Sequence, residues 1–235
     1  MTIDYVGGRY RPSPALMDAH DAAWQCIGAP GTWWAGAERR AIVAEARNAL
    51  RCTLCDARRN AVSPNDVPGQ HDACTELDAP AVDATHRIVS DPGRLTRAWF
   101  KRLIASGLER TRYVELVGVL ATSVVIDTLH RAFGRRIPEL PVAKSGAPRA
   151  ATVAGLVDEG AWVPIVPRTS DEASATGLPA VPNITRALSM VPSAFELFFL
   201  AFRPHYRLQG LDFAIGRPQI EFVASRVSAL NRCFY

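Results

Sequence analysis

The chain has 235 residues, of which 48% are hydrophobic and 21% charged, a composition typical of folded globular proteins. The net charge of +4 is small, and the arginines that supply most of the positive charge are scattered along the sequence instead of forming a basic strip. These features argue against a nucleic-acid-binding protein.

The start of the chain, MTIDYVGGRYRPSP, has neither the basic head nor the apolar stretch of a secretory signal. The longest apolar runs, YVELVGVLATSVVIDTLH and FELFFLAF, carry acidic residues or are too short to span a bilayer. We therefore expect a soluble, cytoplasmic protein that does not contact a membrane. In that reducing compartment, its five cysteines are expected to react, bind metal or pack rather than form structural disulfides.

The elements expected along the chain are helices, which makes the predicted fold class all-α. A short helix is expected to end at Gly28. A long one is expected from Glu38 to about Arg59, because this alanine-rich stretch contains neither proline nor glycine. A polar loop with prolines follows it.

Two further helices are expected in the middle of the chain. In SDPGRLTRAWFKRLIASG, Asp91 can cap a helix, Pro92 suits its first position and Gly107 suits its end. The segment TRYVELVGVLATSVVIDTLHRAFG is expected to be a helix capped by Thr111 and ended by Gly134. It is apolar enough to be largely buried.

Residues 135–182 are rich in proline and glycine with little periodicity, which indicates a linker or an extended wrap. After them, helices are expected to start at Asn183, at Pro192 and near Arg217. The last of these carries an apolar stripe that steps by three and four residues: Ile220, Val223, Val227 and Leu230.

Two cysteine-containing segments are alike, RAIVAEARNALRCTLCDARRNA and IEFVASRVSALNRCFY. Each reads as an apolar helix that runs through Ala-Leu into a cysteine. The first contains the pair Cys52 and Cys55, and the second contains Cys233, twelve residues after Glu221. Cysteines three residues apart lie on one helix face and can form a disulfide after a small adjustment.

Both segments resemble the signature of the alkyl hydroperoxidase D-like (AhpD-like), or carboxymuconolactone decarboxylase-like, superfamily. That signature is a glutamate, a C-x-x-C pair starting twelve residues later, and a histidine four residues after the second cysteine. The two-copy arrangement resembles the alkylhydroperoxidase-related (seleno)protein group. The resemblance implies an N-terminal leader (1–34), an AhpD-like helical domain (35–140), a Pro/Gly-rich linker (141–180) and the first helices of a second, incomplete AhpD-like domain (181–235).

In that group, the residue after CFY can be selenocysteine, whose UGA codon is read as a stop. The resemblance therefore predicts that the second domain continues past Tyr235 and that the second site is incomplete in this chain. It implies that Cys233 is the resolving residue, which forms a bond with the oxidised selenocysteine, and that Glu221 accepts a proton.

The function implied by the resemblance is that of a thiol- or selenol-dependent peroxidase, an antioxidant oxidoreductase. It would reduce hydrogen peroxide or an organic hydroperoxide and accept electrons from a dithiol or a thioredoxin-like protein. In the superfamily, the second cysteine of a pair attacks the peroxide and the first one resolves it. A homo-oligomer is expected, and no cofactor is expected because the sequence has no phosphate loop and no flavin or nicotinamide motif.

The first cysteine pair departs from the signature at two positions. Arg59 stands where the histidine is expected and Arg40 where the glutamate is expected, while Glu38 and Glu45 lie nearby at other spacings. Arginines near the pair can stabilise a thiolate, but arginine does not exchange a proton at neutral pH. A redox role and a vestigial packing role both stay open for this pair.

Two other readings are open. The spacing of three cysteines and a histidine fits a structural zinc site formed by Cys52, Cys55, His71 and Cys74. Alternatively, the chain is a non-catalytic helical oligomerisation or interaction protein with an incidental dithiol. His86 and His130 are expected in helical stretches without a catalytic role.

Overall fold

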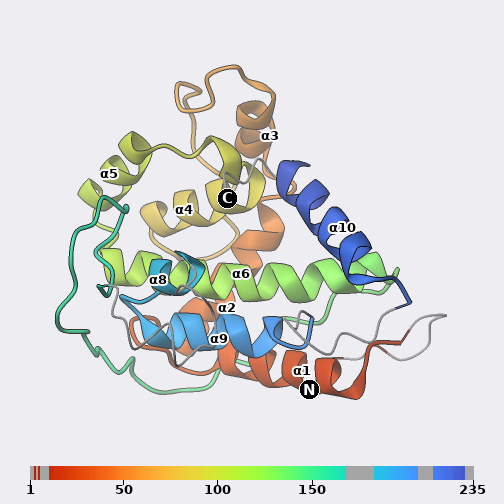
Figure 1. Ribbon diagram of the computed structural model, residues 1–235. Helices are drawn as coiled ribbons and strands as arrows, with labels where there is room; N and C mark the ends of the chain where they lie inside the picture. Colours follow the sequence, from red (N-terminus) through yellow and green to blue (C-terminus); the bar gives the residue numbers. More distant parts are fainter. Residues whose placement is uncertain (1–2, 4, 6–10, 168–182, 206–213, 231–235) are drawn as a thin grey trace.

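The computed structural model describes residues 3, 5, 11–167, 183–205 and 214–230 (Figure 1). Within these residues every regular element is a helix, and the only strand-like pairing is an isolated antiparallel bridge between Val157 and Ile165. The predicted all-α fold class is confirmed.

The described helices follow one another along the chain with one short 3-10 turn, labelled η1, between the fourth and fifth. Their bounds are α1 Pro14–Gly28, α2 Gly36–Asn48, α3 Thr53–Asn60, α4 Ala79–Ser90, η1 Pro92–Arg94, α5 Arg97–Ala105, α6 Arg110–Ala132, α8 Asn183–Ala187, α9 Pro192–Phe202 and α10 Arg217–Leu230.

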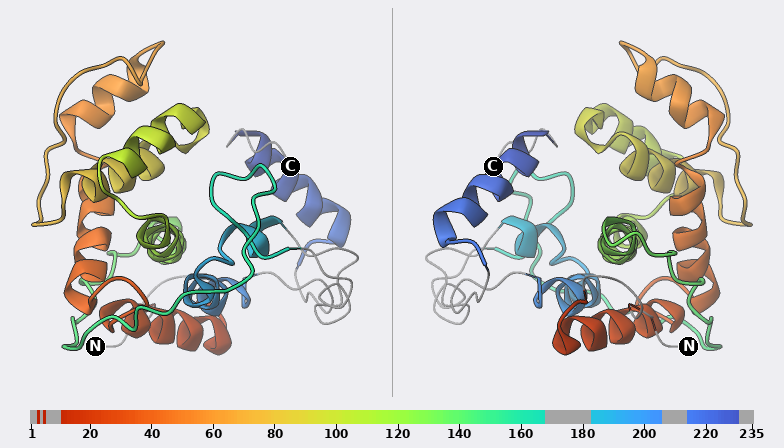
Figure 2. Two further views of the ribbon diagram at one scale, coloured as in Figure 1. Left: turned by 90° about the vertical axis from the view of Figure 1, so that its left-hand side faces the viewer. Right: turned by 90° about the vertical axis from the view of Figure 1, so that its right-hand side faces the viewer.

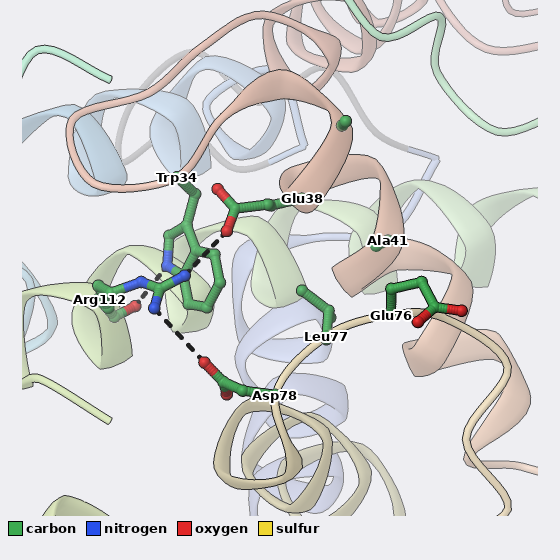
Figure 3. A pocket seen from close by; sticks show the side chains of 8 residues that line it. Trp34, Glu38, Ala41, Glu76, Leu77, Asp78 and Arg112 are labelled. Atoms are coloured by element: carbon green, nitrogen blue, oxygen red, sulfur yellow. Dashed lines mark hydrogen bonds and ion pairs between the residues drawn. The ribbon is translucent and has the colours of Figure 1, made fainter. Parts of the chain in front are cut away.

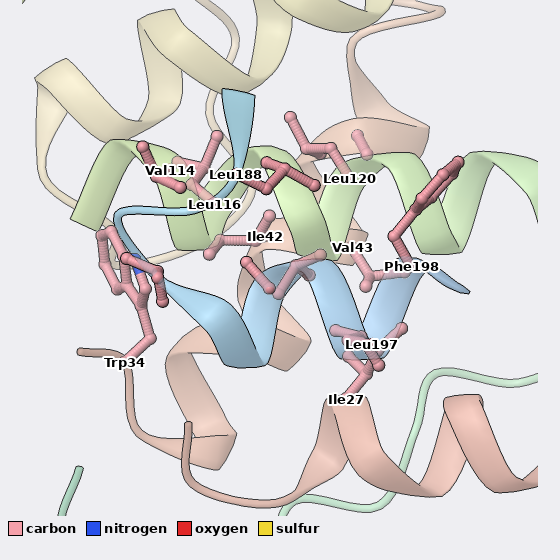
Figure 4. Packing of buried hydrophobic residues seen from close by; sticks show 14 of the residues in the cluster. Ile27, Trp34, Ile42, Val43, Val114, Leu116, Leu120, Leu188, Leu197 and Phe198 are labelled. Atoms are coloured by element: carbon pink, nitrogen blue, oxygen red, sulfur yellow. The ribbon is translucent and has the colours of Figure 1, made fainter. Parts of the chain in front are cut away.

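Helix α6 lies at the centre of the molecule. It is seen end-on in Figure 2, with α2 on one side, α1 and α9 below it and α4 above it. The close-up in Figure 4 shows apolar side chains of α6 beside those of α1, α2 and α9, among them Ile27, Ile42, Leu116, Leu120 and Leu197. This cluster is the main hydrophobic core.

The apolar sequence of α6 fits its central position. Among the described residues it is the one helix long and apolar enough to cross a membrane, and 61% of its most apolar window is buried inside the protein. Core helices commonly show this pattern because they are covered on most sides.

Helices from outside the expected domain 35–140 share its core. Trp24 and Ile27 on α1, and Leu197 and Phe198 on α9, belong to the same buried cluster as the α6 residues. The expected leader (1–34) and the expected second segment (181–235) therefore each contribute a helix that packs directly on α6 or α2.

The long helix expected from Glu38 to Arg59 is wrong, because the chain breaks after Asn48 and restarts at Thr53. The helix expected to start at Asp91 begins at Arg97 instead, since Thr96 provides the side-chain cap. Starts at Asn183 and Pro192 are confirmed.

The final helix, α10, is present but does not bury its apolar stripe. Val223, Val227 and Leu230 are all at least half exposed, and α10 lies beside the core instead of within it (Figure 1). By contrast, the extended segment that follows α6 packs on the core, where Trp162 lies against Phe100 with ring centroids 5.6 Å apart.

The closest approach of the core helices is at Gly118 on α6. A Cβ atom added at this glycine would lie 2.7 Å from Ala194 Cβ and 2.9 Å from Ala194 Cα on α9. Real side chains do not come so close to a backbone, so the two helices can pack here only because residue 118 has no side chain.

We predict that Gly118→Val lowers the free energy of unfolding by about 2 kcal/mol, the usual cost of forcing extra methyl groups into a packed core. Thr128→Val is the matched control, because Thr128 is exposed on the same helix. Urea titrations of the three proteins measure the difference. Equal midpoints for Gly118→Val and the unaltered chain would show that α9 is not held against α6.

Candidate functional site

The break between α2 and α3 places the cysteine pair at the start of a helix. Cys52 is the N-cap residue of α3 and Cys55 lies in its first turn. The helix start is fixed from outside by Asp72, whose carboxylate accepts hydrogen bonds from the Thr53 amide at 2.7 Å and the Thr53 hydroxyl at 2.8 Å. These bonds hold the pKa of Asp72 below its usual value.

Two imidazoles meet the two sulfur atoms. His71 Nδ1 lies 3.6 Å from Cys52 Sγ and 3.5 Å from Cys55 Sγ, and His86 Nδ1 lies 3.3 Å from Cys55 Sγ. Both cysteines are buried, with exposed fractions of 2% and 1%. The histidines come from the segment between α3 and α4 and from α4 itself, so three parts of the chain form the cluster.

Glu45 on α2 holds the far side of the His86 ring. Its Oε2 atom lies 2.9 Å from His86 Nε2, while Oε1 accepts from the Cys74 amide at 2.9 Å and the Thr75 hydroxyl at 2.7 Å. Burial alone would raise the pKa of this carboxyl, but the three hydrogen bonds outweigh it and the pKa lies below its usual value. Glu45 is therefore a buried carboxylate.

The ionised Glu45 sets the tautomer of its neighbour. A carboxylate only accepts hydrogen bonds, so His86 Nε2 carries the hydrogen and Nδ1 offers its lone pair to Cys55. Burial lowers the pKa of His86 below its usual value, which keeps the ring neutral. The arrangement is a thiol, a neutral imidazole and an orienting carboxylate in line.

The second imidazole has the same kind of support. His71 Nε2 lies 2.9 Å from Asp83 Oδ1, and the same carboxylate accepts from the Trp99 ring at 2.8 Å and from Arg58 at 3.0 Å. Burial opposes ionisation of Asp83, but the hydrogen bonds from His71 and Trp99 prevail and lower its pKa to about 2. Arg58 Nη1 also lies 3.1 Å from His71 Nε2. When Nε2 carries the hydrogen and donates it to Asp83, the Nδ1 atom of His71 faces the sulfur atoms as a lone pair.

The resting form of Cys55 is the thiol. Burial raises its pKa to about 12, and the charge of Arg58 opposes this only weakly. Arg58 is paired with Asp83, and Arg59 is paired with Asp56 at the surface. Arg58 therefore stabilises a thiolate at Cys55 less than the sequence suggested, and His86 is the base that lies next to its sulfur.

The predicted site residues have different outcomes. Cys52, Cys55 and His71 come together, but the Cys74 side chain is exposed and lies outside the cluster. His86 occupies the fourth position, which the zinc hypothesis assigned to Cys74. Glu221 lies exposed on α10, where it pairs with Arg217 at 2.8 Å. Cys233 is outside the described residues.

Several residues of the site were not predicted. His86 was expected in a helical stretch without a catalytic role, and Glu45 was set aside because its spacing from Cys52 does not match the signature. Asp83 belongs to none of the motifs found in the sequence. The available signal was helical spacing, since Asp83 and His86 are three residues apart and share a face of α4.

A hollow of about 370 Å³ lies elsewhere, beside the start of α2 (Figure 3). Its acidic residues Glu38 and Asp78 are both paired with Arg112, which also lies 3.5 Å above the Trp34 ring. Glu76 also lines this hollow, which therefore holds three carboxylates and one arginine.

A hollow of about 510 Å³ lies next to the cysteine cluster. Arg58 and Asp83 line it, together with Arg87 and Trp99. Because Asp83 is bonded to His71, this hollow reaches the outer side of the site.

Comparisons of the chain with models of protein families, with curated proteins and with solved structures found no match. The function is therefore argued from the geometry of the site and from the residues that form it.

The ionisation of Asp83 makes the free energy of unfolding depend on pH. Its folded-state pKa of about 2 is below its ordinary value of 3.8, so its contribution is present above pH 4 and is lost as the pH falls towards 2. We predict that the free energy of unfolding falls between pH 5 and pH 2 by about 2 kcal/mol more in the unaltered chain than in Asp83→Asn. Denaturant titrations across this range measure both, and parallel curves would contradict the prediction.

Proposed function

We propose that this chain is a dithiol oxidoreductase that reduces a peroxide. The observation that carries the proposal is the line from Cys55 Sγ to His86 Nδ1, 3.3 Å, and from His86 Nε2 to Glu45 Oε2, 2.9 Å. A thiol beside a base that is itself oriented by a carboxylate is the arrangement used for activated sulfur nucleophiles.

The first step takes place at Cys55. His86 Nδ1 accepts the thiol proton, the sulfur attacks the nearer peroxide oxygen, and the O–O bond breaks. The proton passes to the departing oxygen, so the products are an alcohol or water and a sulfenic acid on Cys55. Glu45 stabilises the imidazolium that exists during the transfer.

The second step uses Cys52. Its thiol attacks the sulfenic sulfur of Cys55, a disulfide forms and water leaves. The two sulfur atoms already lie within 4.8 Å of each other, so only a small movement joins them. A dithiol or a thioredoxin-like donor would then reduce the disulfide.

The set of groups at the site supports this proposal. The superfamily that the sequence resembles uses a glutamate, two cysteines and a histidine, and Glu45, Cys52, Cys55 and His86 provide the same four groups here. The glutamate and histidine come from α2 and α4 instead of from the signature positions, where Arg40 and Arg59 stand.

Burial of the sulfur atoms restricts the substrate. A peroxide reaches Cys55 only if it is small or if the segment between α3 and α4 moves aside. This segment contributes His71 and Asp72, so its movement would also change the surroundings of the sulfur atoms. We therefore favour hydrogen peroxide or a short-chain hydroperoxide over a bulky one.

Variants of the site residues test the peroxidase proposal. In chelator-treated, reduced protein we expect peroxide to form a disulfide between Cys52 and Cys55. Cys55→Ser should abolish the reaction, Cys52→Ser should stop it at a sulfenic acid that a carbon nucleophile can trap, and His86→Gln should slow it by roughly 100-fold.

The measurement is stopped-flow oxidation followed by mass spectrometry. Cys26→Ser is the control, because Cys26 is exposed and lies outside the cluster. If Cys55→Ser consumes peroxide as fast as the unaltered chain, the proposal is wrong. The non-catalytic interaction protein would then be the better reading.

The pH dependence of the first step gives a separate prediction. His86 acts as a base only when neutral, and burial lowers its pKa below the ordinary value of 6.5. The rate of Cys55 oxidation should therefore hold down to pH 6.5 and decline only below it. An acid limb with its midpoint above pH 6.5 would contradict this assignment.

A further inference from the structure

Four ligand atoms converge at the cysteine pair. They are Cys52 Sγ, Cys55 Sγ, His71 Nδ1 and His86 Nδ1, and all of them lie within 4.8 Å of one another. Two sulfur and two imidazole ligands are a common set for tetrahedral zinc.

The separations match those required around a metal. Zn–S bonds of about 2.3 Å and Zn–N bonds of about 2.0–2.1 Å, at tetrahedral angles, put sulfur and nitrogen about 3.6 Å apart. Three of the four sulfur-to-nitrogen pairs measure 3.6, 3.5 and 3.3 Å. The fourth pair, Cys52 Sγ and His86 Nδ1, lies within 4.8 Å. A cation placed among these atoms would need only small shifts of the side chains.

The surroundings present the right atoms to a cation. Glu45 accepts a hydrogen bond from His86 Nε2 at 2.9 Å, so His86 turns an unprotonated Nδ1 atom towards the sulfurs. Asp83 lies 2.9 Å from His71 Nε2, and a hydrogen bond from that atom to Asp83 leaves His71 Nδ1 unprotonated in the same way. Carboxylates that orient ligating histidines in this way are the usual outer shell of zinc sites. The Asp72 amide also donates to Cys52 Sγ at 3.4 Å.

We propose that Cys52, Cys55, His71 and His86 bind one zinc ion in a closed tetrahedral site. The ligand set differs from the one suggested by the sequence, since His86 replaces Cys74. With four protein ligands the metal has no open position, so it would not activate water. It would instead join α3, the following segment and α4.

The same sulfur atoms cannot bind zinc and form a disulfide. Oxidation of the zinc form by a peroxide consumes two thiolates, one ROOH and two protons, and gives the disulfide, ROH, water and free Zn²⁺. Zinc therefore withholds the dithiol from reaction and is released when it is oxidised. This second part of the inference rests on the proposed peroxide chemistry, whereas metal binding does not.

Metal titration tests the site without any peroxide. Full-length reduced protein, stripped with a chelator, is titrated with Zn²⁺ against a chromophoric chelator and separately with Co²⁺, whose thiolate bonds absorb by charge transfer. We expect one ion per chain and tetrahedral Co²⁺ spectra. Cys52→Ser and His86→Gln should each weaken zinc binding by about 100-fold or more, beyond the loss caused by an outer-shell change.

Cys74→Ser distinguishes the two ligand sets, because it keeps the backbone amide that Glu45 uses, and it should bind zinc normally, as should Cys26→Ser. No binding, a sulfur-free octahedral Co²⁺ spectrum, or loss of zinc in Cys74→Ser would each overturn the site. If a variant does not fold, the Co²⁺ spectrum of the unaltered chain still decides.

The link to oxidation has its own measurement. Peroxide added to the zinc form should release Zn²⁺ together with disulfide formation, more slowly than it oxidises the metal-free form. Equal rates would overturn the withholding of the dithiol and leave zinc binding intact. Zinc binding with no oxidation of either form would instead contradict the peroxidase proposal.

Discussion

The candidate site depends on one buried carboxylate. Glu45 is fully buried, and removing a charge from water costs several kcal/mol unless hydrogen bonds replace the lost hydration. Its three bonds, to His86, the Cys74 amide and the Thr75 hydroxyl, supply that replacement and come from two later parts of the chain. The same bonds that offset the cost of burying the charge tie α2 to α4 and fix the tautomer of His86, so the lone pair that faces Cys55 follows from them.

Much of the fold could be predicted from local signals. The helix start at Pro192 and the burial of α6 follow from a proline at the first helical position and from apolar composition, which are both visible in the local sequence. The break between α2 and α3 could not be predicted in this way, because the alanine-rich sequence favours a continuous helix. The restart is set by Asp72, nineteen residues beyond Thr53, and such a distant cap leaves no local pattern.

The site was predicted only in part for the same reason. The spacing of Cys52 and Cys55 is visible in the sequence, and it indicated thiol chemistry or metal binding. The partners of the pair, Glu45 and His86, lie on other helices. At the two positions where the signature has its glutamate and histidine, this chain has Arg40 and Arg59. Residue types sufficient for a proton relay are present, but folding brings them together from different sequence positions.

The packing of α9 on α6 has a consequence for how the protein is made. During synthesis the central helix leaves the ribosome well before α9, whose Ala194 sits against Gly118 and whose Leu197 and Phe198 help to cover the core. Until residue 202 has emerged, one side of α6 has no covering helix. Nascent chains that end between α6 and α9 would therefore expose a hydrophobic surface, and a chaperone that binds such chains would favour correct folding.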